Sequence, residues 1–259
     1  MFERIVGEGV EAHLGERLLS THPLGGGCIG EAYMLRYLRE RTDLLVPEVY
    51  HGSETFLLME FIEGNSNFSV EAEHHAAELL AGLPCITADC YGHERDTLIG
   101  SLDQPNPWTE SWVDFFRDHR LLYLANVAHK ADRLPSEDLR RVQRLAERLD
   151  EMIGEPNPPA LIHGDAWSAN VLAKGDRITA FLDPAIYHAD PEMELAFISL
   201  FNSFGDSFFE RYQEIRAIKP GFFEMRRDLY NLYPLLVHAY FFDGGYLGSV
   251  QSTLDQFGA

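Results

Sequence analysis

Two aspartates and one asparagine in the second half of the chain have the types and spacing that phosphoryl transfer requires. Asp165 lies in the segment 163–170, which reads HGDAWSAN and ends at Asn170, and Asp183 begins the sequence DPA further along. Transfer from ATP needs a carboxylate beside the attacking hydroxyl and oxygen ligands for the magnesium ion that neutralises the phosphates. The Asp-x4-Asn spacing matches a kinase catalytic loop. It predicts that Asp165 orients or deprotonates the acceptor and that Asn170 and Asp183 bind Mg²⁺.

Each aspartate alone has an ordinary structural explanation. An Asp after a Gly is often only a turn residue, and an Asp before a Pro often only ends a strand. The surrounding segment has three short apolar runs, at 160–163, 170–173 and 178–182. These runs predict strands, and the residues 174–176 predict a tight turn between the last two. Asn170 and Asp183 are then expected at the open ends of neighbouring strands, facing one cleft.

The remaining sequence predicts the elements that position this segment. After residue 70, apolar residues recur at helical spacing over 70–82, 109–128, 136–153, 191–204, 207–216 and 222–243. The aromatic residues between 230 and 242 lie on the last of these helices, and their spacing is typical of core packing.

The first 63 residues have a different pattern. A helix is predicted over 1–20, and a glycine cluster follows it. A second helix is predicted over 31–41, and two strands are predicted over 46–50 and 55–62. We therefore expect an α+β fold of two lobes, a small β-containing lobe over 1–63 and a mainly helical lobe over 64–259.

Composition excludes several classes of partner. The chain has 259 residues, and its 41 acidic against 21 basic residues give a net charge of −20, which argues against nucleic acid. No apolar run is long enough to span a membrane, and no secretory signal is visible. Three cysteines cannot form a disulfide framework, so a cytoplasmic location is expected.

At the level of motifs, the chain resembles the fructosamine kinase family. HGDAWSAN is similar to that family's HGDLWSGN, and the segment 183–196 resembles its DPA-x-Y-x-x-D-x-E-x-(D/E)-LA. Upstream, Ile99-Gly100, Gln104, Asn106 and Arg120 match its IG…Q-x-N…RL pattern. Choline kinases and aminoglycoside phosphotransferases share the broader protein-kinase-like fold but usually lack the Trp-Ser pair of the loop.

The resemblance implies ATP-dependent phosphorylation of a sugar hydroxyl of ketosamines, either small molecules or adducts on protein. It implies Asp165 as the catalytic base and Asn170 and Asp183 as the Mg²⁺ ligands. The acceptor is expected near Trp167, His163 and the segment 99–120. The residues expected to bind ATP are Gly25, Gly26, Gly27, Glu31, Met59, Glu60, Phe61 and Ile62.

The small lobe departs from the kinase pattern, because no lysine precedes Lys130. In kinases a strand lysine binds the ATP phosphates and a helix glutamate, here matched by Glu31, holds that lysine. The strand with the lysine is absent between Gly27 and Pro47, so the fold is expected to have a shortened N-lobe. Two alternatives stay open, namely a pseudokinase that binds ligand without transfer and a phosphotransferase for another amino alcohol or an aminoglycoside.

A shortened sheet exposes an edge strand, which predicts a homodimer through that edge.

Overall fold

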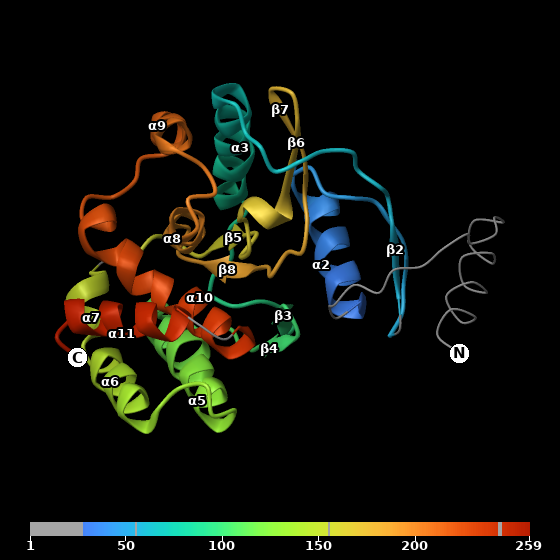
Figure 1. Ribbon diagram of the computed structural model, residues 1–259. Helices are drawn as coiled ribbons and strands as arrows, with labels where there is room; N and C mark the ends of the chain where they lie inside the picture. Colours follow the sequence, from blue (N-terminus) through green and yellow to red (C-terminus); the bar gives the residue numbers. More distant parts are fainter. Residues whose placement is uncertain (1–27, 55, 155, 243–244) are drawn as a thin grey trace.

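The computed structural model describes residues 28–54, 56–154, 156–242 and 245–259 (Figure 1). The helix predicted over 1–20 and the glycine cluster with Gly25, Gly26 and Gly27 lie outside these residues. Within them, none of the helices combines the length and apolar character needed to cross a bilayer.

One helix and two short strands make up the described part before residue 63. They are α2 (Cys28–Arg41), β1 (Val49–Gly52) and β2 (Leu57–Met59). The helix begins three residues before the predicted start and buries Leu35 and Leu38 completely. The strands pair antiparallel, but β1 lies two to three residues later than the predicted 46–50 and β2 is shorter than the predicted 55–62. The turn follows Gly52 and contains a hydrogen bond from the Ser53 N–H to the Phe56 carbonyl at 3.0 Å.

Helices dominate the remainder of the chain, as predicted. Their bounds are α3 (Val70–Gly82), α4 (Trp112–Phe116), α5 (Leu122–Lys130), α6 (Ser136–Ala146), α7 (Leu149–Ile153), α8 (Glu192–Leu200), α9 (Asp206–Ile215), α10 (Arg227–Phe241) and α11 (Tyr246–Gln256). A π-helical turn, Arg117–Leu121, joins α4 to α5, and another, Phe222–Arg226, precedes α10. The helix predicted over 136–153 is interrupted between α6 and α7, and α11 was not predicted. Figure 1 shows α5, α6, α10 and α11 gathered at one end and α3 beside α9 at the other.

Three further antiparallel strand pairs occur after residue 63. They are β3 (Thr97–Ile99) with β4 (Leu102–Gln104), β5 (Ala160–Ile162) with β8 (Tyr187–Ala189), and β6 (Val171–Lys174) with β7 (Arg177–Phe181). The β6–β7 hairpin confirms the prediction from the apolar runs, with Gly175 in its turn at a φ of +60°. The strands β3, β4 and β8 were not predicted.

Backbone hydrogen bonds join the first part of the chain to this hairpin. Asn65 and Ala173 exchange two of them, at 2.9 and 2.8 Å, and the Phe181 N–H donates to the Leu45 carbonyl at 2.7 Å. Helix α2 also packs closely against β3, because Gly30 of the helix has no side chain and leaves room for the Leu98 side chain. The ends of β6 and β7 therefore lie beside α2, which positions the candidate site.

Candidate active site

A loop after β5 carries the HGDAWSAN segment, and its tight path depends on Gly164. This residue has a φ of +83°, and an added Cβ would lie 2.2 Å from the Ala185 carbonyl oxygen. The Ala185 N–H donates to the His163 carbonyl at 2.8 Å. The two segments with catalytic candidates therefore lie in direct contact.

Glu194 of α8 binds the backbone of the same loop through its side chain. Its Oε2 accepts hydrogen bonds from the backbone N–H of His163, at 2.5 Å, and of Gly164, at 3.1 Å. The side chain is buried, and burial raises the pKa of Glu194 to about 7 although the donated N–H groups act in the opposite direction. Glu194 was not among the predicted site residues, although the matched acidic motif of 183–196 contains it.

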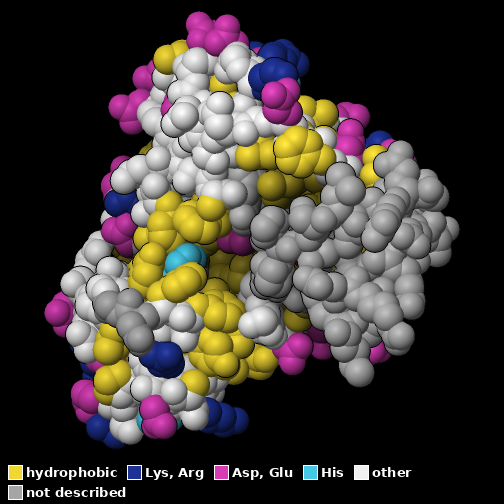
Figure 2. Space-filling view, turned by 45° about the vertical axis from the view of Figure 1, so that its right-hand side comes forward, with side chains coloured by type: hydrophobic (Ala, Val, Ile, Leu, Met, Phe, Trp, Pro, Cys, Tyr) yellow, Lys and Arg dark blue, Asp and Glu magenta, His cyan; other side chains and the backbone are white. Residues whose placement is uncertain are grey.

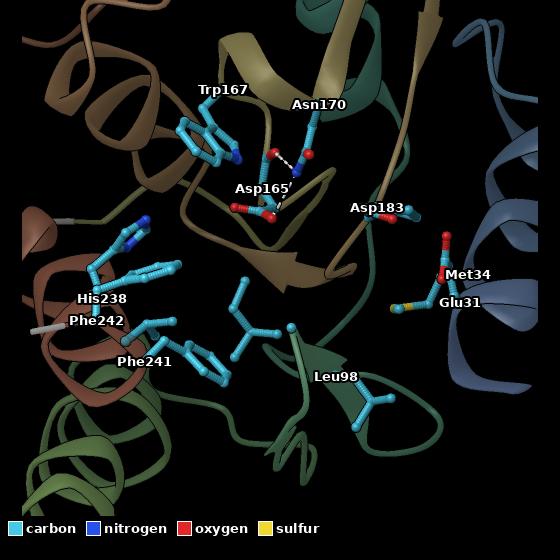
Figure 3. A pocket seen from close by; sticks show the side chains of 14 residues that line it. Glu31, Met34, Leu98, Asp165, Trp167, Asn170, Asp183, His238, Phe241 and Phe242 are labelled. Atoms are coloured by element: carbon cyan, nitrogen blue, oxygen red, sulfur yellow. Dashed lines mark hydrogen bonds between the residues drawn. The ribbon is translucent and has the colours of Figure 1, made fainter. Parts of the chain in front are cut away.

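Asn170 fixes the orientation of the Asp165 carboxylate. Its Nδ2 donates to Asp165 Oδ2 at 2.8 Å and to the Asp165 carbonyl at 3.0 Å (Figure 3). Its amide oxygen makes no hydrogen bond within the described residues and is thus available as a ligand. Burial, followed by the negative charges of Asp183 and Glu194, raises the pKa of Asp165 well above its usual range.

Asp183 follows β7 and lies beside Asn170, as the strand pattern predicts. The Leu182 N–H donates to the Asn170 carbonyl at 2.8 Å, which extends the β6–β7 pairing up to the aspartate. Asp183 itself has a φ of +48°, in the left-handed region that non-glycine residues rarely adopt. Such strain is typical of functional sites.

Across the cleft, Glu31 from α2 faces Asp183 (Figure 3). Burial raises the pKa of Glu31 to about 8, and the hydrogen bond and charge of Asp183 add to the increase. In the kinase pattern the glutamate pairs with a lysine, whereas here its neighbour is a second carboxyl group. The later Lys174 is exposed and pairs with Glu63, at the far end of the β6–β7 hairpin.

These residues line a pocket of about 270 Å³. The carboxylates of Glu31, Asp165 and Asp183 lie along one part of it, and β3 with the following turn contributes Leu98, Ile99 and Gly100. The opposite end is formed by Trp167, Val237, His238, Phe241 and Phe242. In Figure 2, hydrophobic side chains and a histidine border the corresponding hollow on the side where the residues are described.

The aromatic end of the pocket was predicted only as part of the core. The residues Tyr230 and Tyr233 of α10 are buried in the core, as their spacing indicates. The last turn of the same helix instead presents His238 and Phe241 to the pocket. Sequence reasoning missed them because helical spacing does not distinguish a core face from a pocket wall.

The structure brings together Asp165, Asn170, Asp183, Trp167 and Glu31. It does not bring His163 to the pocket: this residue is fully buried beneath the loop, where burial lowers its pKa to about 3. Four residues that were expected to bind ATP do not line this pocket, namely Met59, Glu60, Phe61 and Ile62, and Phe61 is 89% exposed.

Gln104, Asn106 and Arg120 lie behind the pocket rather than in it. The Gln104 side chain donates to the Ala185 carbonyl at 3.1 Å and accepts from the Tyr233 hydroxyl at 2.6 Å. Arg120, fully buried, donates to Asn106 Oδ1 at 2.5 Å. Of the segment 99–120, only Ile99 and Gly100 line this pocket, and Gln104 bonds the backbone after Asp183.

Comparison with solved structures defines the class of fold. An aminoglycoside phosphotransferase in a ternary complex with streptomycin and ATP superposes with a TM-score of 0.64 at 18% identity, covering 97% of this chain and 95% of that one. A protein described as a fructosamine-3-kinase from Haemophilus somnus 129PT gives a TM-score of 0.82 at 26% identity, with coverages of 97% and 96%. The chain thus has the protein-kinase-like fold, as the sequence predicts.

Sequence comparison narrows the class to a family. The family model described as fructosamine kinase matches residues 16–259. A probable ketoamine kinase of Synechocystis is 36% identical over 236 residues, covering 87% of this chain and 77% of the relative. A chloroplastic protein-ribulosamine 3-kinase of Oryza sativa subsp. indica is 33% identical over 243 residues, covering 88% and 68%. The chain belongs to the fructosamine kinase family.

Proposed function

We propose that this protein transfers the γ-phosphoryl group of ATP to a sugar hydroxyl of a ketosamine, either a small molecule or an adduct on protein. The observation that carries the proposal is the convergence of Asp165, Asn170 and Asp183 on one pocket. The names of the relatives, which include ketoamine kinase and ribulosamine 3-kinase, support the acceptor class. The structurally similar aminoglycoside phosphotransferase was solved with ATP bound, which supports ATP as the phosphoryl donor.

Asp165 is the proposed base. Because the Asn170 amide group holds one of its oxygens at 2.8 Å, the carboxylate has a fixed orientation toward the pocket. A hydroxyl placed beside Asp165 can then donate its proton as the oxygen attacks phosphorus. The buried Glu194 keeps the loop in place through its backbone bonds.

The donor set near Asp183 fits Mg²⁺. A carboxylate and an amide oxygen are the hard ligands that this ion prefers, and it usually takes only one or two from protein. No group of three or more His, Cys, Asp or Glu side chains within the described ranges is arranged to hold a metal alone. We therefore expect Asn170 and Asp183 to bind Mg²⁺ together with the nucleotide phosphates, whose charge the ion neutralises.

In this pocket Glu31 contacts Asp183, whereas the corresponding glutamate of kinases contacts a phosphate-binding lysine. Among the residues that the structure describes, the pocket is lined by three carboxylates and by no Lys or Arg. Phosphate binding at this site therefore depends on the divalent ion more strongly than in a kinase with the lysine. ATP affinity measured with and without Mg²⁺ is expected to differ correspondingly.

Release of ADP in the presence of fructosyl-lysine tests the proposal. Asp165→Asn is expected to lower kcat by a factor of about 10³ while ATP binding is retained. Asp150→Asn, a change at an exposed position of α7, serves as the matched control and is expected to leave kcat unchanged. ATP binding without ADP release in the unmodified protein would instead favour the pseudokinase, and activity only on other amino alcohols or aminoglycosides would favour the related phosphotransferase.

A further inference from the structure

A second cavity, of about 230 Å³, is lined by residues of the segment before β5, of α8 and of the end of α9. It shares no lining residue with the pocket that contains Asp165 and Asp183. Much of its wall is apolar, including Pro84, Pro158, Pro191, Leu195 and Ile218. Apolar walls with a small number of polar groups are typical of sites for small molecules.

Tyr212 of α9 contributes an unbonded hydroxyl group to the wall of this cavity. Its side chain is 3% exposed, and within the described residues its hydroxyl makes no hydrogen bond. Buried polar groups nearly always have a partner, so an unbonded donor in a cavity wall indicates a partner outside the chain. Burial raises the pKa of Tyr212, so the hydroxyl keeps its proton and can donate it in a hydrogen bond.

Arg216 follows α9 and brings a positive charge to the same cavity. Its N–H donates to the Tyr212 carbonyl at 2.8 Å, so the two residues lie one helical turn apart. Among the described residues, no carboxylate pairs with its guanidinium group, which donates to Cys85 Sγ at 3.4 Å. Sulfur is a weak acceptor, so the guanidinium group can still bind an anion.

Glu192 is the acidic residue of the wall, and its charge is already balanced. Its two carboxylate oxygens accept from the Arg226 side chain at 2.6 and 2.8 Å, in an ion pair that is largely buried. Asp190 does not line the cavity, and Asn157 bonds its carboxylate through the backbone N–H and the side-chain amide. The unbalanced charge in the wall is therefore the positive charge of Arg216.

We infer that this cavity is a second ligand site, whose ligand is a small carboxylic acid with an apolar body. A carboxylate can accept two parallel N–H bonds from the Arg216 guanidinium group. The Tyr212 hydroxyl supplies a further donor, and the proline and aliphatic walls contact the apolar body. The inference goes beyond the proposed phosphoryl transfer, because the two sites have no residue in common.

Phenylacetate and phenylacetamide are nearly isosteric probes of this site, because they differ in the charge of one group. Titrations of the whole protein, followed by NMR of the probe, are expected to give an affinity about tenfold higher for phenylacetate. Inorganic phosphate at equal concentration is expected not to displace phenylacetate, because it has no apolar body. No binding of phenylacetate, equal affinities for the two probes, or displacement by phosphate would each overturn the inference.

Substitutions locate the binding. Arg216→Gln removes the charge and is expected to weaken phenylacetate binding about tenfold. Tyr212→Phe keeps the buried ring, removes only the hydroxyl and is expected to weaken binding about fivefold, so it tests the site even if Arg216→Gln does not fold. Arg144→Gln, at an exposed position of α6 outside the cavity, is the matched control and should leave the affinity unchanged.

Trp167→Ala distinguishes the second site from the candidate active site. Trp167 lines the candidate active site and not the second cavity, so this substitution is expected to leave phenylacetate binding unchanged. Weaker binding in Trp167→Ala would place the carboxylate in the candidate active site. That result, or unchanged binding in Tyr212→Phe or in folded Arg216→Gln, would overturn the inference.

Discussion

At position 164 the catalytic loop has no space for a side chain. The Gly164 φ of +83° is unfavourable for other residues, and the Ala185 carbonyl occupies the position that a Cβ would need. Both obstacles lie in the backbone, so they cannot be relieved by a change of rotamer. The loop and the segment after Asp183 can approach each other only because this residue is glycine.

We therefore predict that Gly164→Ala lowers the free energy of unfolding by about 3 kcal/mol or more and abolishes activity. Gly175→Ala is the matched control. Gly175 also has a positive φ, of +60°, but no atom lies within 4 Å of its added Cβ. Its cost is expected to be about 1 kcal/mol, from the backbone conformation alone. Urea unfolding measures both, and equal costs would contradict the steric argument.

The buried carboxyl group of Glu194 makes the stability of the protein depend on pH. Burial raises its pKa from 4.5 to about 7, so the folded protein holds this proton where the unfolded chain releases it. The stability that this group contributes is complete below pH 4.5 and is lost as the pH rises through about 7. Glu194→Gln does not titrate, and its free energy of unfolding should thus fall less between pH 5 and 8 than that of the unmodified protein. Parallel pH profiles of the two proteins would show that Glu194 does not titrate as expected.

At the scale of elements, the β3–β4 hairpin connects three parts of the site. Ile99 and Gly100 line the pocket, while Gln104 bonds both the backbone at Ala185 and the hydroxyl of Tyr233 on α10. A short hairpin therefore fixes the distance between the segment after Asp183 and the helix that forms the aromatic wall.

Gln104→Leu removes these two bonds and a third, to the Thr97 hydroxyl at 2.8 Å, and leaves the buried Ala185 carbonyl and Tyr233 hydroxyl without this partner. We expect a loss of about 2 kcal/mol in the free energy of unfolding, together with a reduced kcat. Gln143→Leu, at an exposed position of α6, is the control and should change neither quantity appreciably. Chemical denaturation and steady-state kinetics measure the two effects.

The elements also show what the sequence can and cannot predict. The β6–β7 hairpin and its flanking Asn170 and Asp183 were predictable because apolar runs, a glycine turn and the chemical residues are contiguous. The three-residue strands β3 and β8 are too short for a clear pattern and form through distant partners. His238 and Phe241 reach the pocket only through the packing of α10 against the catalytic loop, which local spacing does not specify.

At the scale of the whole molecule, the division into lobes at residue 63 and the homodimer stay predictions. Within the described residues, β1 and β2 pair only with each other, which is consistent with an open edge. We expect a dimer at micromolar concentration in analytical ultracentrifugation. Tyr50→Lys, in β1 at a position that is 45% exposed, should shift the protein toward monomer because a charged edge disfavours pairing. Monomer alone in the unmodified protein would contradict the prediction.

The ion pair between Lys174 and Glu63 has a consequence for the protein's own chemical durability. Reducing sugars damage proteins chiefly at lysine amino groups, and this chain has only three lysines. One is engaged by a carboxylate, and another, Lys219, donates to the Pro156 carbonyl at 3.3 Å. A chain with three lysines therefore presents few primary amines to reducing sugars, and its many arginines supply positive charge without a primary amine.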